Sequence, residues 1–447
     1  MNSKARLLID DSPGGNWAGT GPIRGIAVVF GIFLATRLVV WTATYSGVMI
    51  NFRITQHIEP PLEPKLPDIV EKLREPDSPE RRFFDANVAN LEPMLGFDSW
   101  HYRQILLNGY HGPLPQPGGA PDRSDRNLAF FPFYPLACSL IAPLVGVPAA
   151  LVGVSNLCAL LAGILLYLWI RRRVDEASAR YAVAFLFCWP TACFFSYGYA
   201  EGLTVLLVVM TLVLADRGHF LLAAVACAAA TATRPTALAL AAVVMLAYWM
   251  RQSGPVGRRL VRTGLLGLVA AGGIAAYAGY LTYLYGTPLV YFSNFKVEWI
   301  DDEARSTWFQ YLTMARVWDQ FKYFGRAIIG FPEGLVHLTH PFAWNMPANF
   351  AILFVSLAGL TRVARSFRPY LLLGPLIFLH GYLASGGASF GVNPIARYTV
   401  VSVPAFVVLA AWCAREWKSG PRVVVLALLM LLQVTWAFHF GLGEWPG

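Results

Sequence analysis

Long apolar runs recur along this chain and constrain its fold more than any other feature. The first extends from Ile23 to Thr44, and the others lie near 129–147, 149–170, 181–198, 200–215, 219–233, 236–250, 263–285, 348–361, 369–384, 397–414 and 422–440. A helix needs about 20 such residues to cross a bilayer. Inside the hydrocarbon region a helix satisfies its own backbone groups, and the runs do not alternate as barrel strands do. The sequence therefore predicts an all-α polytopic membrane protein with about 10–13 transmembrane helices.

Charge is scarce and unevenly placed. Only 14% of the residues are charged, against roughly 25% in soluble proteins. The net charge of +9 comes from basic clusters between the apolar runs, at 171–173, 258–262, 362–368 and 415–422. Such clusters mark cytoplasmic loops. We therefore expect these basic loops to lie beside a lipid bilayer and not to bind nucleic acid.

Two long segments lie on the side opposite these clusters, at 45–127 and 286–324. The first holds 12 of the 26 acidic residues, and loops of this length are usually functional or disordered. We expect it to carry amphipathic helices and to belong to a catalytic module over 1–250, followed by a second module over 251–447. If 129–147 and 149–170 both cross, the triple arginine at 171–173 lies on the wrong side. One of these two runs is then only partial, and the sequence does not say which.

The six cysteines all lie inside apolar segments, without paired spacing. Cysteines in this setting behave as small buried hydrophobic residues. We therefore expect neither a disulfide nor a zinc site.

The segment from Phe97 to Ile105 carries the clearest chemical pattern. If it is helical, Asp98, His101 and Tyr102 share a face, because residues three and four apart are neighbours on a helix. A carboxylate held at the membrane surface can act as a general base on a hydroxyl. The plainer alternatives are that Asp98 caps a helix and that His101 is an interfacial hydrogen-bonding residue.

Three arginines and one glutamate lie within or at the edge of apolar runs: Arg37, Arg234, Arg397 and Glu201. Ionisable groups are costly in membranes and therefore suggest function. Guanidinium groups match phosphate geometry, and a glutamate at a helix tip could orient an arginine or a sugar hydroxyl. Alternatively, Arg37 reaches toward the headgroups, and Glu201 and Arg234 simply pair with each other.

Four segments in order resemble motifs of bacterial relatives of the GPI mannosyltransferase II family. The matching segments are Asp98-Ser99-Trp100-His101-Tyr102 with Gly109-Tyr110, Phe131-Pro132-Phe133-Tyr134-Pro135, Tyr199-Ala200-Glu201-Gly202-Leu203 and Ala232-Thr233-Arg234-Pro235-Thr236. A weaker echo is Ala396-Arg397-Tyr398. Gly202 stands where the family usually has serine, and Ala237 where it has glycine.

The resemblance implies a GT-C-type glycosyltransferase that transfers mannose, with inversion, from a polyprenyl-phosphate donor on the extracytoplasmic face of a bacterial plasma membrane. Asp98 would be the catalytic base, and no metal or cofactor would be required. Combining these motifs with the ionisable residues in the apolar runs, we expect the substrate-binding residues to be Arg37, His101, Tyr102, Tyr134, Glu201, Arg234 and Arg397. The acceptor, which could be a glycan, a glycolipid or a protein, is left open.

Two other functions are compatible with these residues. One is a transporter or flippase of lipid-linked glycans, although no internal repeat of the transporter kind is evident. The other is a metal-dependent oligosaccharyl-type transferase, in which Asp98 would act with Asp301 and Asp302.

Overall fold

The computed structural model describes residues 7–9, 22–55, 75, 78–83, 85–86, 91–110, 125–286, 322, 324–326, 328–330, 340–384 and 395–444. Much of the two long loops expected from the sequence, including Asp301 and Asp302, lies outside these residues.

Several described helices are suited to a bilayer. Three are long and apolar enough to cross one: α1 (Pro22–Thr55), α7 (Val147–Arg173) and α23 (Ser419–Gly441). Two bent pairs also qualify if each counts as one span. They are α8 (Glu176–Cys188) with η4 (Pro190–Ser196), bent by 76°, and α12 (Val256–Ala270) with α13 (Gly272–Tyr285), bent by 53°. The chain is thus an integral membrane protein.

The described residues form helices and no named strand; the one β-bridge among them joins Ile9 to Val363. The prediction of an all-α polytopic membrane protein is confirmed. The other α-helices described are α3 (Pro79–Phe83), α4 (Asp98–Asn108), α5 (Phe133–Ser139), α6 (Ala142–Val145), α9 (Glu201–Asp216), α10 (Phe220–Thr231), α11 (Leu238–Arg251), α18 (Pro341–Gly359), α19 (Arg368–Leu371), α20 (Leu373–Ala384), α21 (Ile395–Tyr398) and α22 (Val403–Glu416). The short 3-10 helices are η2 (Glu92–Met94), η3 (Asp125–Ala129), η5 (Pro235–Ala237) and η7 (Thr399–Val401).

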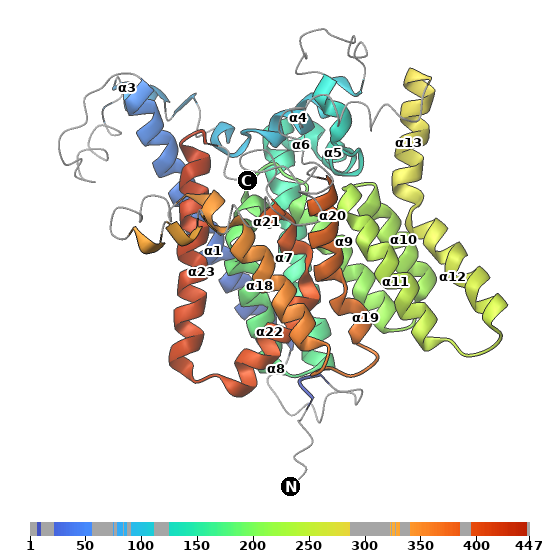
Figure 1. Ribbon diagram of the computed structural model, residues 1–447. Helices are drawn as coiled ribbons and strands as arrows, with labels where there is room; N and C mark the ends of the chain where they lie inside the picture. The colour runs from blue at the N-terminus through green and yellow to red at the C-terminus, as the bar shows by residue number, and fades with distance from the viewer. Residues whose placement is uncertain are drawn as a thin grey trace.

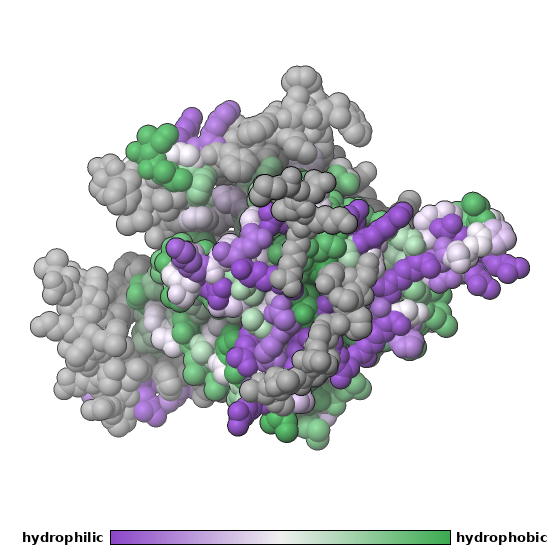
Figure 2. Space-filling view, turned by 90° about the horizontal axis from the view of Figure 1, so that it is seen from below, coloured by the Kyte–Doolittle hydropathy of each residue, from purple (hydrophilic) through white to green (hydrophobic). Residues whose placement is uncertain are grey.

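The bundle has two chemically different ends (Figure 1). At the end near the N-terminus, arginines tie the helix termini together: Arg251 donates to the carbonyl of Asp216, and Arg173 donates to Ser366. We call this the arginine-rich end, and Figure 2 shows many hydrophilic side chains across it. α4, α5 and α6 lie at the opposite end. The 16 residues of α9 connect the two ends, a length of about 24 Å.

The first span is longer than the sequence predicts. We expected it to end at Thr44, yet α1 continues to Thr55, so the first loop begins after Thr55 rather than at Tyr45.

The run 129–147 does not cross the bundle. It forms α5, of 7 residues, and α6, of 4 residues, each far shorter than the roughly 20 residues of a span. Pro132 lies at the start of α5, Pro143 lies in α6, and Gly146 ends α6 with a φ of 83°. α7 therefore makes the crossing. This settles the question left open by the sequence and places Arg171–Arg173 at the arginine-rich end.

Close helix contacts position the ends of the bundle. A Cβ atom on Gly202 of α9 would lie 2.1 Å from the backbone oxygen of Ser155 in α7. A Cβ atom on Gly441 of α23 would lie 2.1 Å from the backbone oxygen of Thr44 in α1. Only glycine permits backbones to approach so closely. These contacts fix α9 against α7 and α23 against α1.

Candidate active site

Four charged side chains from distant parts of the sequence meet at the end of the bundle opposite the arginine-rich end. Nη1 of Arg397 in α21 lies 2.6 Å from Oδ2 of Asp98, the first residue of α4. Nε of Arg397 donates a hydrogen bond to Oε1 of Glu201, the first residue of α9. Nη1 of Arg234, just before η5, donates to the same oxygen. We call these four residues the charged cluster.

Burial differs across the charged cluster. The side chain of Glu201 is 1% exposed and that of Arg397 2%, whereas Arg234 is 12% and Asp98 14% exposed. Among the described residues, Oε2 of Glu201 has no hydrogen-bond partner. The formal charges of the two guanidinium groups and the two carboxylates sum to zero, and this pairing offsets part of the free-energy cost of burying charge. Asp98 and Arg234 are the members that a substrate can reach most directly.

Aromatic rings hold the two guanidinium groups. The Arg397 guanidinium carbon lies 4.7 Å from the ring centre of Phe194 and 4.6 Å from that of Tyr199. The Arg234 guanidinium carbon lies 5.2 Å from the ring centre of Tyr398. Cations over aromatic faces are stabilised by the ring quadrupole. The rings therefore help to hold both arginines in place.

The backbone before Asp98 is strained. Phe97 has φ 54° and ψ −117°, a region that residues with a side chain rarely occupy. The Tyr199 hydroxyl accepts a hydrogen bond from the N–H of Asp98 at 3.3 Å and donates to the carbonyl of Gly96 at 3.2 Å. The Phe97 ring packs edge-on against Phe440 of α23 at 5.2 Å. These contacts hold the turn that presents Asp98.

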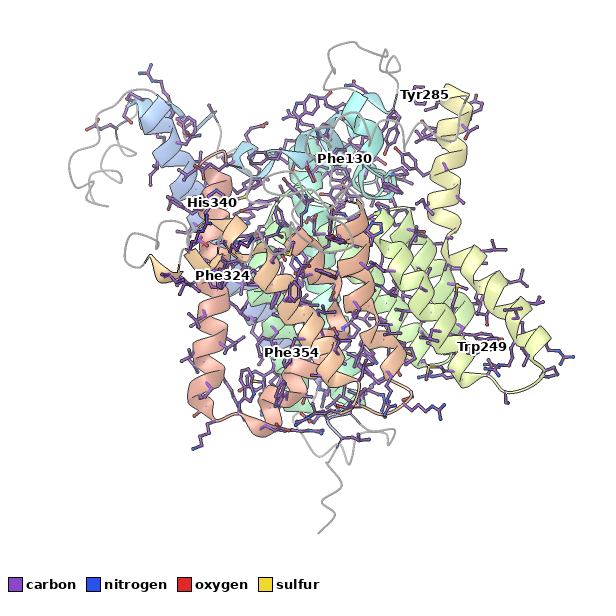
Figure 3. All side chains as sticks on the ribbon, viewed as in Figure 1. Phe130, Trp249, Tyr285, Phe324, His340 and Phe354 are labelled. Atoms are coloured by element: carbon purple, nitrogen blue, oxygen red, sulfur yellow. The ribbon has the colours of Figure 1, made fainter. Side chains whose placement is uncertain are left out.

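The sequence predicts His101 and Tyr102 at the site, and α4 places both beside Phe130. Nδ1 of His101 lies 2.9 Å from Oδ1 of Asn127, and the His101 ring stacks on Phe130 at 4.4 Å. Figure 3 shows Phe130 at the α4 end of the bundle. Burial raises the pKa of Tyr102. Its ring packs against Phe130 and Tyr134, so Tyr102 can shape the site.

Tyr134 has a structural partner. Its ring packs edge-on against Tyr102 at 4.9 Å, and its hydroxyl donates to the carbonyl of Leu151 at 2.7 Å. This bond ties α5 to α7 beneath α4. A contact of Tyr134 with substrate stays a prediction.

The structure places Arg37 in the break between α8 and η4. Its Nη1 donates to the carbonyl of Ala192 at 2.6 Å and to Ser196 at 3.0 Å, and its Nη2 donates to the carbonyl of Phe187 at 3.3 Å. Pro190, which has no N–H, interrupts the helix here, so Arg37 satisfies carbonyls that the bend leaves unpaired. The predicted phosphate contact of Arg37 remains a prediction.

Sequence reasoning missed the aromatic partners of the cluster, which are Tyr199, Phe194 and Tyr398, and the hydrogen-bond partner of His101, which is Asn127. Two of them had a signal, because Tyr199 belongs to the motif that contains Glu201 and Tyr398 follows Arg397. The other two had none, since only the fold brings them to the site. The two guanidinium groups are the donors of the cluster that can bind an anion, and an incoming phosphate would share them with the carboxylates of Asp98 and Glu201.

No family model matches this chain, and no curated protein matches it. Among solved structures, the chain is similar to ArnT from Cupriavidus metallidurans in the apo state, at 16% identity and a TM-score of 0.44, over 73% of this chain and 56% of that one. It is also similar to ArnT bound to undecaprenyl phosphate, at 15% identity and a TM-score of 0.44, over 73% and 57%. A third structure is the oligosaccharyltransferase AglB from Archaeoglobus fulgidus with an inhibitory peptide and a dolichol-phosphate, at 15% identity and a TM-score of 0.39, over 77% and 51%. The match covers little more than half of each of these chains. Likenesses this distant say nothing about activity.

Proposed function

We propose that this protein is a membrane-embedded glycosyltransferase. It moves a sugar from a polyprenyl-phosphate carrier to an acceptor hydroxyl at the extracytoplasmic face of a bacterial plasma membrane. The observation that carries the proposal is the charged cluster, in which a partly exposed carboxylate adjoins two arginines at one end of an apolar bundle. Sugar transfer from a phosphate requires a base for the incoming hydroxyl and cations for the departing phosphate.

Each member of the charged cluster has a role in this reaction. Asp98 accepts the proton of the acceptor hydroxyl, because it is a carboxylate at the accessible edge of the cluster. Arg397 and Arg234 neutralise the phosphate, as guanidinium groups bind phosphate oxygens in pairs. Glu201 lies between the two arginines and holds them in place. Arg397 contacts both carboxylates, so the base and one of the phosphate ligands are paired neighbours in this structure.

The bonds change in one displacement. The acceptor oxygen forms a bond to the anomeric carbon as its proton passes to Asp98. On the opposite face, the bond between that carbon and the phosphate oxygen breaks, which inverts the configuration. The lipid phosphate leaves with an additional negative charge, which Arg397 and Arg234 stabilise. Asp98 then returns its proton to solvent, and the polyprenyl phosphate departs along the bilayer.

The proposed sugar is mannose, and the proposed family is that of GPI mannosyltransferase II. Both rest on the motifs around Asp98, Tyr134, Glu201 and Arg234. The arginine clusters support placing the charged cluster on the extracytoplasmic side, because positive loops stay in the cytoplasm. The acceptor is a glycan, a glycolipid or a protein that presents a hydroxyl group there.

The test is a transfer assay in proteoliposomes. Purified protein is incubated with polyprenyl-phosphate carrying radiolabelled mannose, together with membrane extract as the acceptor source. We expect radiolabelled mannose to move from the lipid to a component of the extract. Radiolabelled glucose supplied on polyprenyl phosphate should stay on its carrier.

Protein-free liposomes and the Arg397→Gln variant serve as controls. If glucose transfers and mannose does not, the sugar assignment is wrong. If neither sugar leaves its carrier with any acceptor extract, the glycosyltransferase proposal fails.

A further inference from the structure

A second group of chemically reactive side chains lies at the far end of α23. His439 is in the last turn of this helix, Glu444 follows it, and His340 precedes α18. One ligand atom from each of the three residues lies within 4.8 Å of those of the other two. The rings of His340 and His439 are 5.1 Å apart, centre to centre. None of the three belongs to the charged cluster.

The local backbone explains why Glu444 faces His439. Gly443 has a φ of 79° and its N–H bonds the carbonyl of Phe440 at 3.1 Å, while the N–H of Glu444 bonds the carbonyl of His439 at 3.0 Å. This pair of bonds is a Schellman motif, which turns the chain back over the end of a helix. As a result, Oε2 of Glu444 lies 2.5 Å from Nδ1 of His439.

We propose that His340, His439 and Glu444 form a zinc-binding site that ties the end of α23 to the start of α18. Two imidazoles and one carboxylate are ligands that Zn²⁺ takes in proteins, with a fourth position left for solvent or an anion. Ligand atoms around tetrahedral zinc lie about 3.4 Å apart, given metal–ligand bonds of about 2.0–2.1 Å. Glu444 is exposed and follows a turn, so its carboxylate is free to move to an ion that the two histidines bind.

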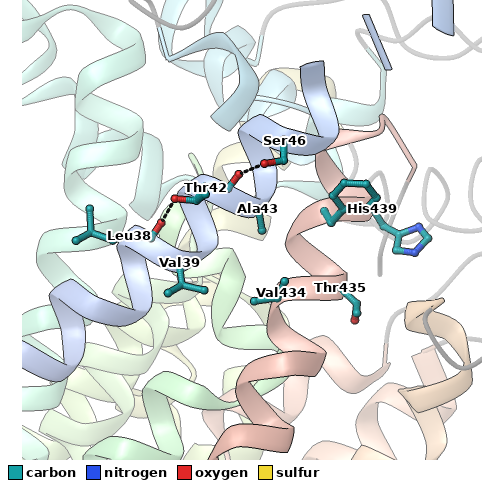
Figure 4. Close-up of a pocket in the computed structure, with 9 residues that line it drawn as sticks. Leu38, Val39, Thr42, Ala43, Ser46, Val434, Thr435 and His439 are labelled. Atoms are coloured by element: carbon teal, nitrogen blue, oxygen red, sulfur yellow. Dashed lines mark hydrogen bonds between the residues drawn. The ribbon is translucent and has the colours of Figure 1, made fainter. Parts of the chain in front are cut away.

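A hydrogen-bonded pair of His439 and Glu444 is the simpler arrangement, but it leaves the placement of His340 unexplained. His340 comes from a segment 99 positions earlier in the chain, and its ring nonetheless meets that of His439. Figure 4 shows the His439 ring projecting from α23 on the side away from α1. His439 also lines the apolar groove of about 660 Å³ that α1 and α23 form, so the metal site adjoins this groove.

The site has a consequence for the charged cluster. Phe440, next to His439, stacks on Tyr197 at 3.9 Å and contacts Phe97, the strained residue before Asp98. Metal held by His439 fixes the last turn of α23. The metal thereby also fixes Phe440, the ring that contacts Phe97 in the turn before Asp98.

The experiment measures binding of Zn²⁺ itself to the purified full-length protein. After EDTA treatment and removal of the chelator, titration calorimetry should show one zinc ion per chain. Replacing zinc with Co²⁺ should give the visible absorption of a tetrahedral site. Zinc should also raise the melting temperature by about 2–4 °C.

His340→Gln and His439→Gln should each weaken zinc binding at least a hundredfold. His219→Gln, a matched change at an exposed histidine, should bind zinc as the unmodified protein does. Because the first two variants could fold poorly, zinc protection of histidines against acylation is measured on the unmodified protein, with His439 located by mass spectrometry. Absence of stoichiometric zinc binding, or equal binding by His340→Gln and His219→Gln, would overturn the proposal.

Discussion

At the scale of single residues, the charged cluster was largely predictable. Glu201, Arg234 and Arg397 each stand out as an ionisable residue at the edge of an apolar run, where charge is costly. Asp98 stands out because it shares a helical face with His101 and Tyr102. The pairing of Glu201 with Arg234 was one of the alternatives that the sequence offered, and the structure shows it. The pairing of Arg397 with Asp98 was not predictable, since the two residues lie 299 positions apart. Arg37 shows the same limit, because an isolated intramembrane arginine does not reveal whether it binds a ligand or, as here, helix carbonyls.

Glu201→Gln tests the buried part of the cluster. The carboxylate accepts from both Arg397 and Arg234, so the change leaves two adjacent guanidinium groups short of a countercharge. We expect a loss of about 3–5 kcal/mol in the free energy of unfolding, measured by denaturation in detergent. The control is Glu416→Gln, which breaks an exposed ion pair with Arg362 and should cost less than about 1 kcal/mol. Equal losses would show that the cluster is not a buried charge network.

Variants of Tyr199 can distinguish two roles of this residue: its hydroxyl positions Asp98, and its ring holds the guanidinium group of Arg397. Tyr199→Phe removes the hydroxyl that bonds Gly96 and Asp98 but keeps the ring beside Arg397. We expect kcat to fall about tenfold, equivalent to about 1.4 kcal/mol, with KM for the lipid donor unchanged. Tyr199→Leu also removes the ring and should raise this KM. A rise in KM for Tyr199→Phe would contradict this division of roles.

At the scale of elements, apolar content located the helices but not their breaks. The runs 129–147 and 181–198 read as single segments, yet the structure divides the first into α5 and α6 and bends the second by 76° at Pro190. Proline lacks the N–H that would continue a helix, so the prolines in these runs indicate the breaks. The predicted segments followed the apolar content of the runs instead. The zinc ligands gave no such signal, because only the fold brings His340 to His439.

Gly202 illustrates how packing overrides a family pattern. The resemblance predicts serine here, but α9 crosses α7 too closely for any side chain. Gly202→Ala should therefore destabilise the protein by about 1–3 kcal/mol through overpacking, seen as a lower unfolding midpoint. Gly153→Ala, in α7 with open space around it, should be neutral or stabilising by up to about 1 kcal/mol. If both variants behave alike, the α7–α9 contact is looser than described.

At the scale of the whole molecule, the two ends differ in charge as the sequence predicts. The arginine clusters lie together at one end, and the charged cluster lies at the other, separated by the length of α9. α1 packs against α23 and α8 against α22, so the first and last parts of the chain build one core. This arrangement explains how Arg397 completes a site that otherwise belongs to the first 250 residues.

The proposed orientation can be measured with single cysteines. Asn108→Cys, exposed at the end of α4, should react with an impermeant maleimide in right-side-out vesicles. Gly420→Cys, exposed in the first turn of α23, should react only in inverted vesicles. The native cysteines are mostly buried, which keeps the background low. The reverse pattern would place the charged cluster in the cytoplasm.

The central claim is that Asp98 removes a proton while a sugar leaves a lipid phosphate. The most direct test is single-turnover transfer by Asp98→Asn, with folding and donor binding checked in parallel. Because asparagine cannot accept the proton, the rate should fall by about 10² or more. The variant should stay folded and bind donor at least as tightly, with a lower unfolding midpoint because Arg397 loses the countercharge of Asp98. A folded Asp98→Asn variant that transfers sugar at the normal rate would contradict the account.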